Sequence, residues 1–145
     1  MVEYTKLRNI NRGYMKLDVW QKAIDLFKLV AQIVPKQGLE LKVRAQIIDA
    51  AQSVGANIAE GYSRRSVNQY IQHLYIALGS MSEVFSRLVC VKETGLLADP
   101  EFGRFDILHY EIENKMLNLI RSLEEKRKTG TWTDRLSEEL AEYNP

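Results

Sequence analysis

The side chains best suited to metal chemistry in this chain of 145 residues are its two histidines. Asp106 and His109 have the spacing of one half of a di-metal site in a helical bundle, which needs a Glu-x-x-His unit twice and two further carboxylates. His73 has no carboxylate at the matching position. We therefore expect both histidines to make surface or interhelical hydrogen bonds, and we expect no metal ion and no other cofactor.

The single cysteine and the hydroxyl side chains form no catalytic pattern. Cys90 stands between Val89 and Val91, which predicts a buried thiol with nothing nearby to activate it. The chain has no glycine-rich phosphate loop ending in Lys-Ser/Thr and no serine nucleophile motif. The sequence therefore predicts a protein that is not an enzyme.

Positive charge is the remaining chemical feature, and it is unevenly distributed. Residues 1–65 carry eleven Lys and Arg against six Asp and Glu, whereas residues 131–145 carry one against four. Cations placed near the phosphates of a nucleic acid release condensed counterions, which gives salt-dependent affinity. The candidate nucleic-acid-binding residues are Lys6, Arg8, Arg12, Lys16, Arg64, Arg65, Arg121, Lys126, Arg127 and Lys128.

Two further observations bear on these cations. Tyr4, Tyr14 and Tyr62 lie among them and can stack on unpaired bases. Several of the cations also follow expected helix C-termini, where positive charge is favourable through the helix dipole alone. A solvated charged surface is therefore the alternative to a binding surface.

Four segments combine helical periodicity with start and stop signals. The expected helices span residues 18–34, 39–61, 66–94 and 99–129. Side-chain caps are expected at Asp18, at Ser66 in capping-box spacing with Gln69, and at Asp99. Glycines that end a helix in the left-handed conformation are expected at Gly61, Gly95 and Gly130.

Apolar rows at alternating steps of three and four define the expected core faces. In chain order they are Trp20, Ile24, Phe27, Ala31 and Val34; Ile47, Ala51, Val54 and Ile58; Tyr70, Leu74, Ala77, Met81, Val84, Leu88 and Val91; and Phe105, Leu108, Ile112, Met116, Leu119 and Leu123. The third helix carries a second row, made of Val67, Ile71, Leu78 and Phe85. One row suffices for a bundle core, so the second row needs either a broader intramolecular contact or another subunit.

Short connections between four long helices favour antiparallel neighbours. We therefore expect an all-α fold, an up-down-up-down antiparallel four-helix bundle over residues 17–130. A basic N-terminal arm, residues 1–16, precedes it, and an acidic tail, residues 131–145, follows as a short docked helix or as a mobile segment. This topology brings the basic clusters to one end of the bundle.

Polar side chains stand beside the apolar row of the second helix. Asn57 and Glu60 are three positions apart near its end, and Ser80 and Glu83 on the third helix are their expected partners. We prefer hydrogen bonds between helices to a ligand site as the role of this group.

Three ordered motifs carry a family resemblance. They are Leu17-Asp18-Val19-Trp20-Gln21-Lys22-Ala23, residues 53–64 with Asn57, Glu60 and Gly61, and residues 76–83 with Ser80 and Glu83. In these motifs the chain resembles, over about residues 17–125, the four-helix-bundle family encoded in intervening sequences of bacterial large-subunit ribosomal RNA genes. That family is similar to the accessory variability proteins of diversity-generating retroelements, which form pentameric barrels and bind nucleic acid and a reverse transcriptase.

The resemblance implies a ring-like homopentamer in which a neighbouring subunit covers the second row of the third helix. It also implies a non-enzymatic protein that binds RNA or another nucleic acid. The alternative is a protein-interaction scaffold, such as the accessory subunit of a reverse transcriptase. The chain starts without the apolar core of a secretion signal, and no apolar run has the length of a membrane span, so we expect a cytoplasmic protein without membrane contact.

Overall fold

The protein is a bundle of four long helices. The computed structural model describes Tyr4 and residues 9–133, and these residues contain no strand. The helical elements in chain order are η1 Ile10–Lys16, α1 Asp18–Ile33, η2 Val34–Gln37, α2 Leu41–Tyr62, α3 Val67–Glu93 and α4 Asp99–Thr129. The bounds of the four α-helices lie within two residues of those expected from the sequence.

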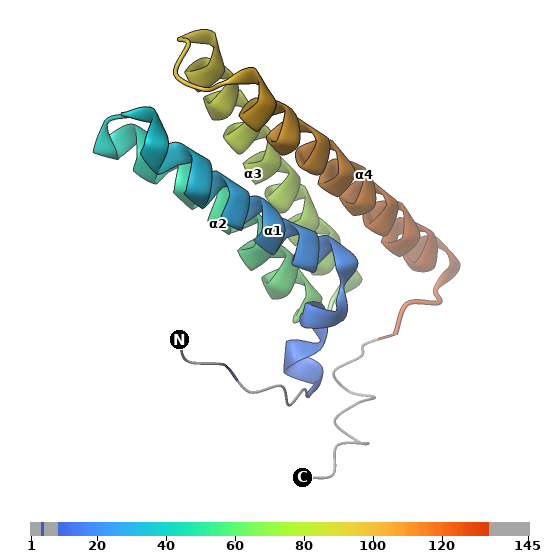
Figure 1. Cartoon of the computed structure of the whole chain (residues 1–145). Helices are drawn as coiled ribbons and strands as arrows, with labels where there is room; N and C mark the ends of the chain where they lie inside the picture. The colour runs from blue at the N-terminus through green and yellow to red at the C-terminus, as the bar shows by residue number, and fades with distance from the viewer. Residues whose placement is uncertain (1–3, 5–8, 134–145) are drawn as a thin grey trace.

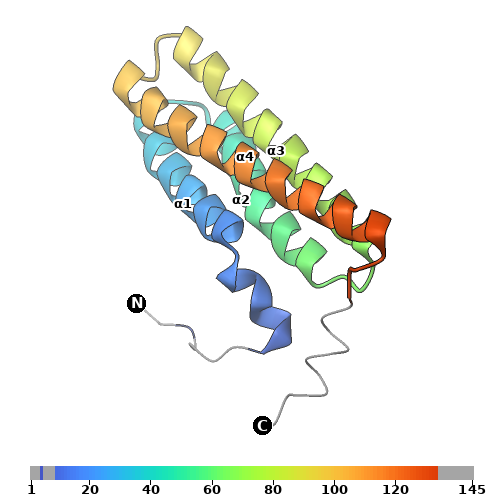
Figure 2. The same cartoon turned by 90° about the vertical axis from the view of Figure 1, so that its right-hand side faces the viewer.

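Successive helices run in opposite directions along the bundle (Figures 1 and 2). α2 packs most extensively against α3, and α1 contacts both α2 and α4, so that the four helices close around one core. The 3-10 helix η1 contacts α1 and α2. The starts of α1 and α3 therefore share one end of the bundle with the ends of α2 and α4, as Figure 1 shows.

The helix ends follow the expected signals in part. The Ser66 hydroxyl accepts a hydrogen bond from the Gln69 backbone N–H at 3.4 Å, which confirms this cap. Gly95 and Gly130 have φ angles of 80° and 70°, in the left-handed region, as expected. Asp18 and Asp99 were expected to precede their helices, but each is the first helical residue and makes no capping hydrogen bond.

The carboxylate of Asp18 instead binds α4. It lies 2.5 Å from Lys115 Nζ, and this hydrogen bond lowers the pKa of Asp18 and raises that of Lys115. Because the pKa of Asp18 is lowered on folding, the ion pair stabilises the bundle near neutral pH and is lost as acid protonates the carboxylate. The contact joins the start of α1 to α4.

The expectation for Gly61 is wrong. This glycine is a buried residue inside α2, which continues to Tyr62. A Cβ added to Gly61 would lie 2.8 Å from the Cβ of His73 and 3.2 Å from the backbone oxygen of Tyr70. The missing side chain thus allows α3 to approach α2 closely, so the glycine is required for packing and not for a turn.

We predict that Gly61→Ala destabilises the bundle. The Cβ clash with α3 should cost about 1–3 kcal/mol, partly offset by a gain of about 1 kcal/mol in helix propensity. Gly103→Ala in α4 is the matched control, because a Cβ there has no neighbour within 4 Å. Thermal unfolding should show a lower melting temperature for Gly61→Ala alone, and an equal or higher one would contradict this role.

The core rows of α2 and α3 match their sequence patterns. All four expected residues of α2 and all seven of the first α3 row are buried. In α4, Leu108 and Leu119 are only partly buried, and His109 and Ile120 are buried in their place. His109 packs against Phe85 of α3, and Ile120 lies eleven positions further along the same face of α4, so α4 turns this face further inward than its apolar row indicates.

The core row of α1 differs from the expected one by about one position. The buried residues are Val19, Ala23, Leu26, Val30 and Ile33, together with Val34 of η2. Trp20 and Phe27, taken as core residues, are partly buried and pack against the edge of the core. Both rows are apolar, and packing against α2 and α4 selects the row with smaller side chains.

The second row of α3 has an intramolecular partner. Ile71 is buried, and Val67, Leu78 and Phe85 are partly buried against the core. Phe85 packs on Phe105 of α4 with ring centroids 6.2 Å apart. The bundle therefore supplies the broader contact for this row.

Candidate nucleic-acid interface

The end of the bundle that holds the ends of η1, α2 and α4 and the start of α3 is called here the basic end (Figure 1). Contacts between these elements fix their relative positions. Arg127 Nη1 at the end of α4 donates to Asn68 Oδ1 at the start of α3, at 2.9 Å. The ring of Tyr62 at the end of α2 covers Gly13 of η1, where a Cβ would lie 2.5 Å from the tyrosine oxygen.

Most of the candidate cations that the structure describes lie at the basic end. Arg12 and Lys16 belong to η1, Arg64 and Arg65 follow α2, and Lys126 to Lys128 form the last turn of α4. Arg121 stands about 12 Å before the end of α4 and donates a hydrogen bond to Asn118 Oδ1 at 3.3 Å. Lys6 and Arg8 lie outside the described residues.

The side chains set the charge of this end. In an antiparallel bundle each end holds two helix N-termini and two C-termini, so the helix dipoles largely cancel there. The acids of the end are Asp18, Glu60, Glu124 and Glu125, which the cations outnumber. The basic end therefore has a net positive charge within the described part of the chain.

Ion pairing and hydrogen bonds fix several side chains of the basic end. Arg64 Nη2 lies 2.6 Å from Glu60 Oε1, and the Arg64 side chain remains 43% exposed. The same carboxylate oxygen lies 3.9 Å from His73 Nε2. Tyr75 donates to Glu124 Oε1 at 3.2 Å, and this bond raises the pKa of the phenol. Arg64 is thus positioned by α2 while part of its guanidinium faces solvent.

The stacking role expected for the tyrosines stays a prediction, but two of the rings take part in packing contacts. Tyr14 packs edge-on against Trp20 with ring centroids 5.3 Å apart, and Tyr62 packs against Tyr70 at 6.0 Å. Both rings thus contribute to the packing of the bundle. Tyr4 is 69% exposed.

The polar group between α2 and α3 is a hydrogen-bonded link. Asn57 Nδ2 donates to the backbone oxygen of Ser53 at 2.8 Å and to its hydroxyl at 3.0 Å. Ser80 donates to the Ser53 hydroxyl at 3.0 Å. Ser53, whose role the sequence pattern did not indicate, therefore joins the two expected partners.

Glu60 and Glu83 do not join this link. Glu60 pairs with Arg64, and Glu83 Oε2 accepts from Arg87 Nε at 3.2 Å. Arg87 in turn donates to Gln46 Oε1 of α2 at 3.1 Å. Glu60 and Glu83 therefore each neutralise the arginine four positions further along the chain.

One of the two histidines, His109, has a structural position in the core. His109 is buried, and its Nε2 lies 2.7 Å from the backbone oxygen of Met81, which confirms an interhelical hydrogen bond. Its ring packs against Phe85 and Phe105, whereas Asp106 lies exposed on the surface. No three His, Cys, Asp or Glu side chains gather as metal ligands among the residues that the structure describes.

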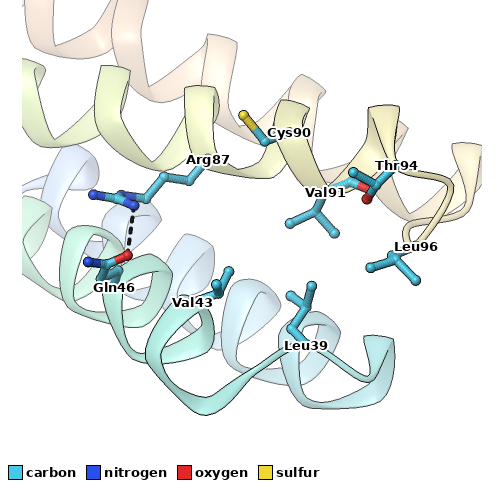
Figure 3. A pocket seen from close by; sticks show the side chains of 8 residues that line it. All are labelled: Leu39, Val43, Gln46, Arg87, Cys90, Val91, Thr94 and Leu96. Atoms are coloured by element: carbon cyan, nitrogen blue, oxygen red, sulfur yellow. Dashed lines mark hydrogen bonds between the residues drawn. The ribbon is translucent and has the colours of Figure 1, made fainter.

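The expectation for Cys90 is wrong, because this residue is exposed. It follows the buried Leu88 by two positions, which turns its side chain away from the core although its neighbours are apolar. It borders an open hollow of about 300 Å³ between α2 and α3 (Figure 3). The lining residues are Leu39, Val43, Gln46, Arg87, Cys90, Val91, Thr94 and Leu96.

A second surface stands out because it lacks charge. Two exposed rows flank the contact between α3 and α4, and together they are called here the α3–α4 outer face. The residues are Tyr75, Gly79, Ser82 and Ser86 on α3 and Ile107, Tyr110, Asn114 and Leu117 on α4. Ile107 and Tyr110 are 74% and 67% exposed. This face is therefore suited to contact with another apolar surface.

The composition of α3 reflects the same face. Within the described chain, α3 is the one helix whose length and composition would allow it to cross a membrane, with a mean hydropathy of 1.4. The core helix of a bundle can have the same length and composition, and the first row of α3 is buried in this bundle. Only 33% of the apolar stretch of α3 is buried inside the bundle. The exposed side of this helix is therefore also poor in charge.

Comparison with known proteins identifies one family. The family described as 23S rRNA-intervening sequence protein matches residues 15–119, which include α1, α2, α3 and most of α4. A search of curated proteins gives no match.

Proposed function

Because the chain belongs to the 23S rRNA-intervening sequence protein family, we propose that it is a cytoplasmic, non-enzymatic, RNA-binding protein that contacts phosphates with its basic end. The main support is the position of cations from η1, from the residues after α2 and from the last turn of α4 at one end of the bundle. These segments are separated by up to about 110 residues in sequence. Their cations can therefore engage several phosphates at once.

The packing of the basic end favours recognition of the nucleic-acid backbone. Tyr14 and Tyr62 are engaged within the bundle, which leaves few aromatic faces for stacking on bases. Arginines and lysines at phosphates position a nucleic acid without reading its sequence. The proposed ligand is therefore structured RNA recognised by its shape, with Arg64, Arg65 and Arg127 as central contacts.

We further propose that the protein assembles as a ring of identical subunits, with five as the expected number. The large side chains of the α4 row, Ile107, Tyr110 and Leu117, can pack against the small side chains of the α3 row in another copy. A Cβ added to Gly79 in that row would meet no atom within 4 Å, so space for such a contact exists. A ring requires that this contact runs head to tail, with the α4 row of each subunit on the α3 row of the next, because reciprocal pairing of the same face gives a two-fold dimer.

The same face supports a second candidate function. An uncharged outer face can also bind a different protein, such as a reverse transcriptase, and the protein would then be a scaffold. A scaffold whose basic end meets an acidic protein surface would not need RNA. Whether the isolated protein binds RNA therefore distinguishes the RNA-binding function from the scaffold function.

The test is fluorescence anisotropy of the purified full chain with labelled structured RNA and matched DNA across a salt series. We expect micromolar or tighter binding that prefers RNA and weakens steeply as salt increases. Absence of binding to either nucleic acid at low salt would reject RNA binding and favour the scaffold.

A further inference from the structure

We propose that the acidic C-terminal segment, residues 134–145, binds the basic end of its own chain and competes there with nucleic acid. This inference rests on the proposed function of the basic end. It identifies a ligand for that surface within the protein and gives the surface a means of regulation. The position where the described chain ends, the length of the remaining segment and its charge support it.

The structure fixes the point from which the segment departs. Gly130 is left-handed, and the backbone N–H of Thr131 donates to the Lys126 oxygen at 2.9 Å, which ends α4. The hydroxyls of Thr129 and Thr131 lie 2.8 Å apart, and Trp132 packs against the core. The chain therefore turns at the basic end and remains against the bundle as far as Trp132.

The segment has the charge that this surface binds. Residues 134–145 contain Asp134, Glu138, Glu139 and Glu142 and one cation, Arg135. The described cations nearest in sequence, Lys126 to Lys128, lie fewer than ten residues before Asp134. The other end of the bundle carries the pairs Lys92–Glu93 and Lys92–Asp99 and is closer to neutral. Opposite charge thus favours the basic end as the binding surface.

The segment is long enough to reach every cation of the basic end. Twelve residues span at most about 40 Å, whereas one helix is about 10–12 Å wide. Attachment to α4 gives the segment an effective concentration in the millimolar range, so weak ion pairs suffice for competition. Each exposed pair contributes little, and all of them weaken in salt. We expect the segment to reduce RNA affinity roughly tenfold at low salt.

The first test compares three forms of the protein by RNA anisotropy. They are the full chain, a chain ending at Thr133, and the full chain with Glu138→Gln, Glu139→Gln and Glu142→Gln. Both altered forms should bind RNA roughly tenfold more tightly than the full chain at about 50 mM salt, and the difference should shrink at high salt. The full chain with Leu136→Ser and Leu140→Ser keeps the acids and is the matched control. Equal affinity of all forms would overturn the proposal.

The second test does not depend on RNA. Backbone amide NMR spectra of the full chain and of its triple-Gln variant should differ at the basic end, around Arg64, Arg65 and Lys126 to Lys128. Such shifts without any RNA binding would support the intramolecular contact and reject the proposed function. Identical spectra would reject the contact, whether or not the protein binds RNA.

Discussion

Reversing both Arg64 and Arg65 to glutamate is expected to weaken RNA binding roughly 100-fold at about 50 mM salt, if each charge reversal costs a factor of ten. Arg64 is exposed beside Glu60 and Arg65 follows it, so both reversals place carboxylates among the cations of the basic end. The slope of affinity against salt should also become shallower, by about one unit for each phosphate that the protein no longer neutralises. Anisotropy across a salt series measures both effects.

The matched control carries the same change in net charge at the other end of the bundle. Lys36 and Lys42 are exposed in η2 and in the first turn of α2. The pair Lys36→Glu and Lys42→Glu should change RNA affinity by no more than about threefold, because long-range attraction is screened. Equal losses in both double variants would mean that overall charge, and not the basic end, determines binding.

The fold of the reversed variant requires its own check, because Glu60 loses its partner and gains a like charge nearby. Arg64→Gln with Arg65→Gln removes the cations without this repulsion. It should weaken RNA binding roughly tenfold while leaving the melting temperature close to that of the parent chain. Retained affinity in both double variants would remove Arg64 and Arg65 from the interface.

The second large effect is expected for assembly. Ile107→Glu with Tyr110→Glu should convert the oligomer into single chains of 16.8 kDa, as measured by analytical ultracentrifugation. Burial of each large side chain is worth about 2 kcal/mol, so losing two should raise the dissociation constant at each contact roughly 1000-fold. Both residues are more than two-thirds exposed, so the fold of the subunit should persist.

A control on the other face of the bundle locates the contact. Gln32 in α1 and Gln52 in α2 are exposed, and Gln32→Glu with Gln52→Glu adds the same charge there. This variant should keep the mass of the parent oligomer. Loss of assembly in the control alone would place the contact on α1 and α2, and a parent protein that is already a single chain would reject the ring.

Sequence periodicity predicted most of the fold, and the misses have physical causes. The first row of α3 is continuous over seven positions, and the apolar row beside it also lies against the core, so periodicity alone identified the buried face of that helix. In α1 two neighbouring rows are apolar, and the sequence cannot choose between them because the choice depends on how α2 and α4 approach. Gly61 was misread for a related reason, since the approach of α3 decides whether a glycine serves a turn or close packing.

The candidate site was predictable in outline but not in its contacts. Antiparallel topology alone places the ends of α2 and α4 together, so the grouping of Arg64 with Arg127 follows from helix order. The pairing of Arg64 with Glu60 and the packing of Tyr62 over Gly13 depend on side-chain positions that spacing does not specify. The exposure of Cys90 was missed because its neighbours in sequence are not its neighbours on the helix surface.

Ultraviolet cross-linking of the full chain to structured RNA, with the cross-linked peptides identified by mass spectrometry, tests the central claim most directly. We predict cross-links in peptides from η1, from the α2–α3 connection and from the last turns of α4, the segments that meet at the basic end. Cross-links confined to the α1–α2 and α3–α4 connections at the other end of the bundle would contradict an RNA interface at the basic end.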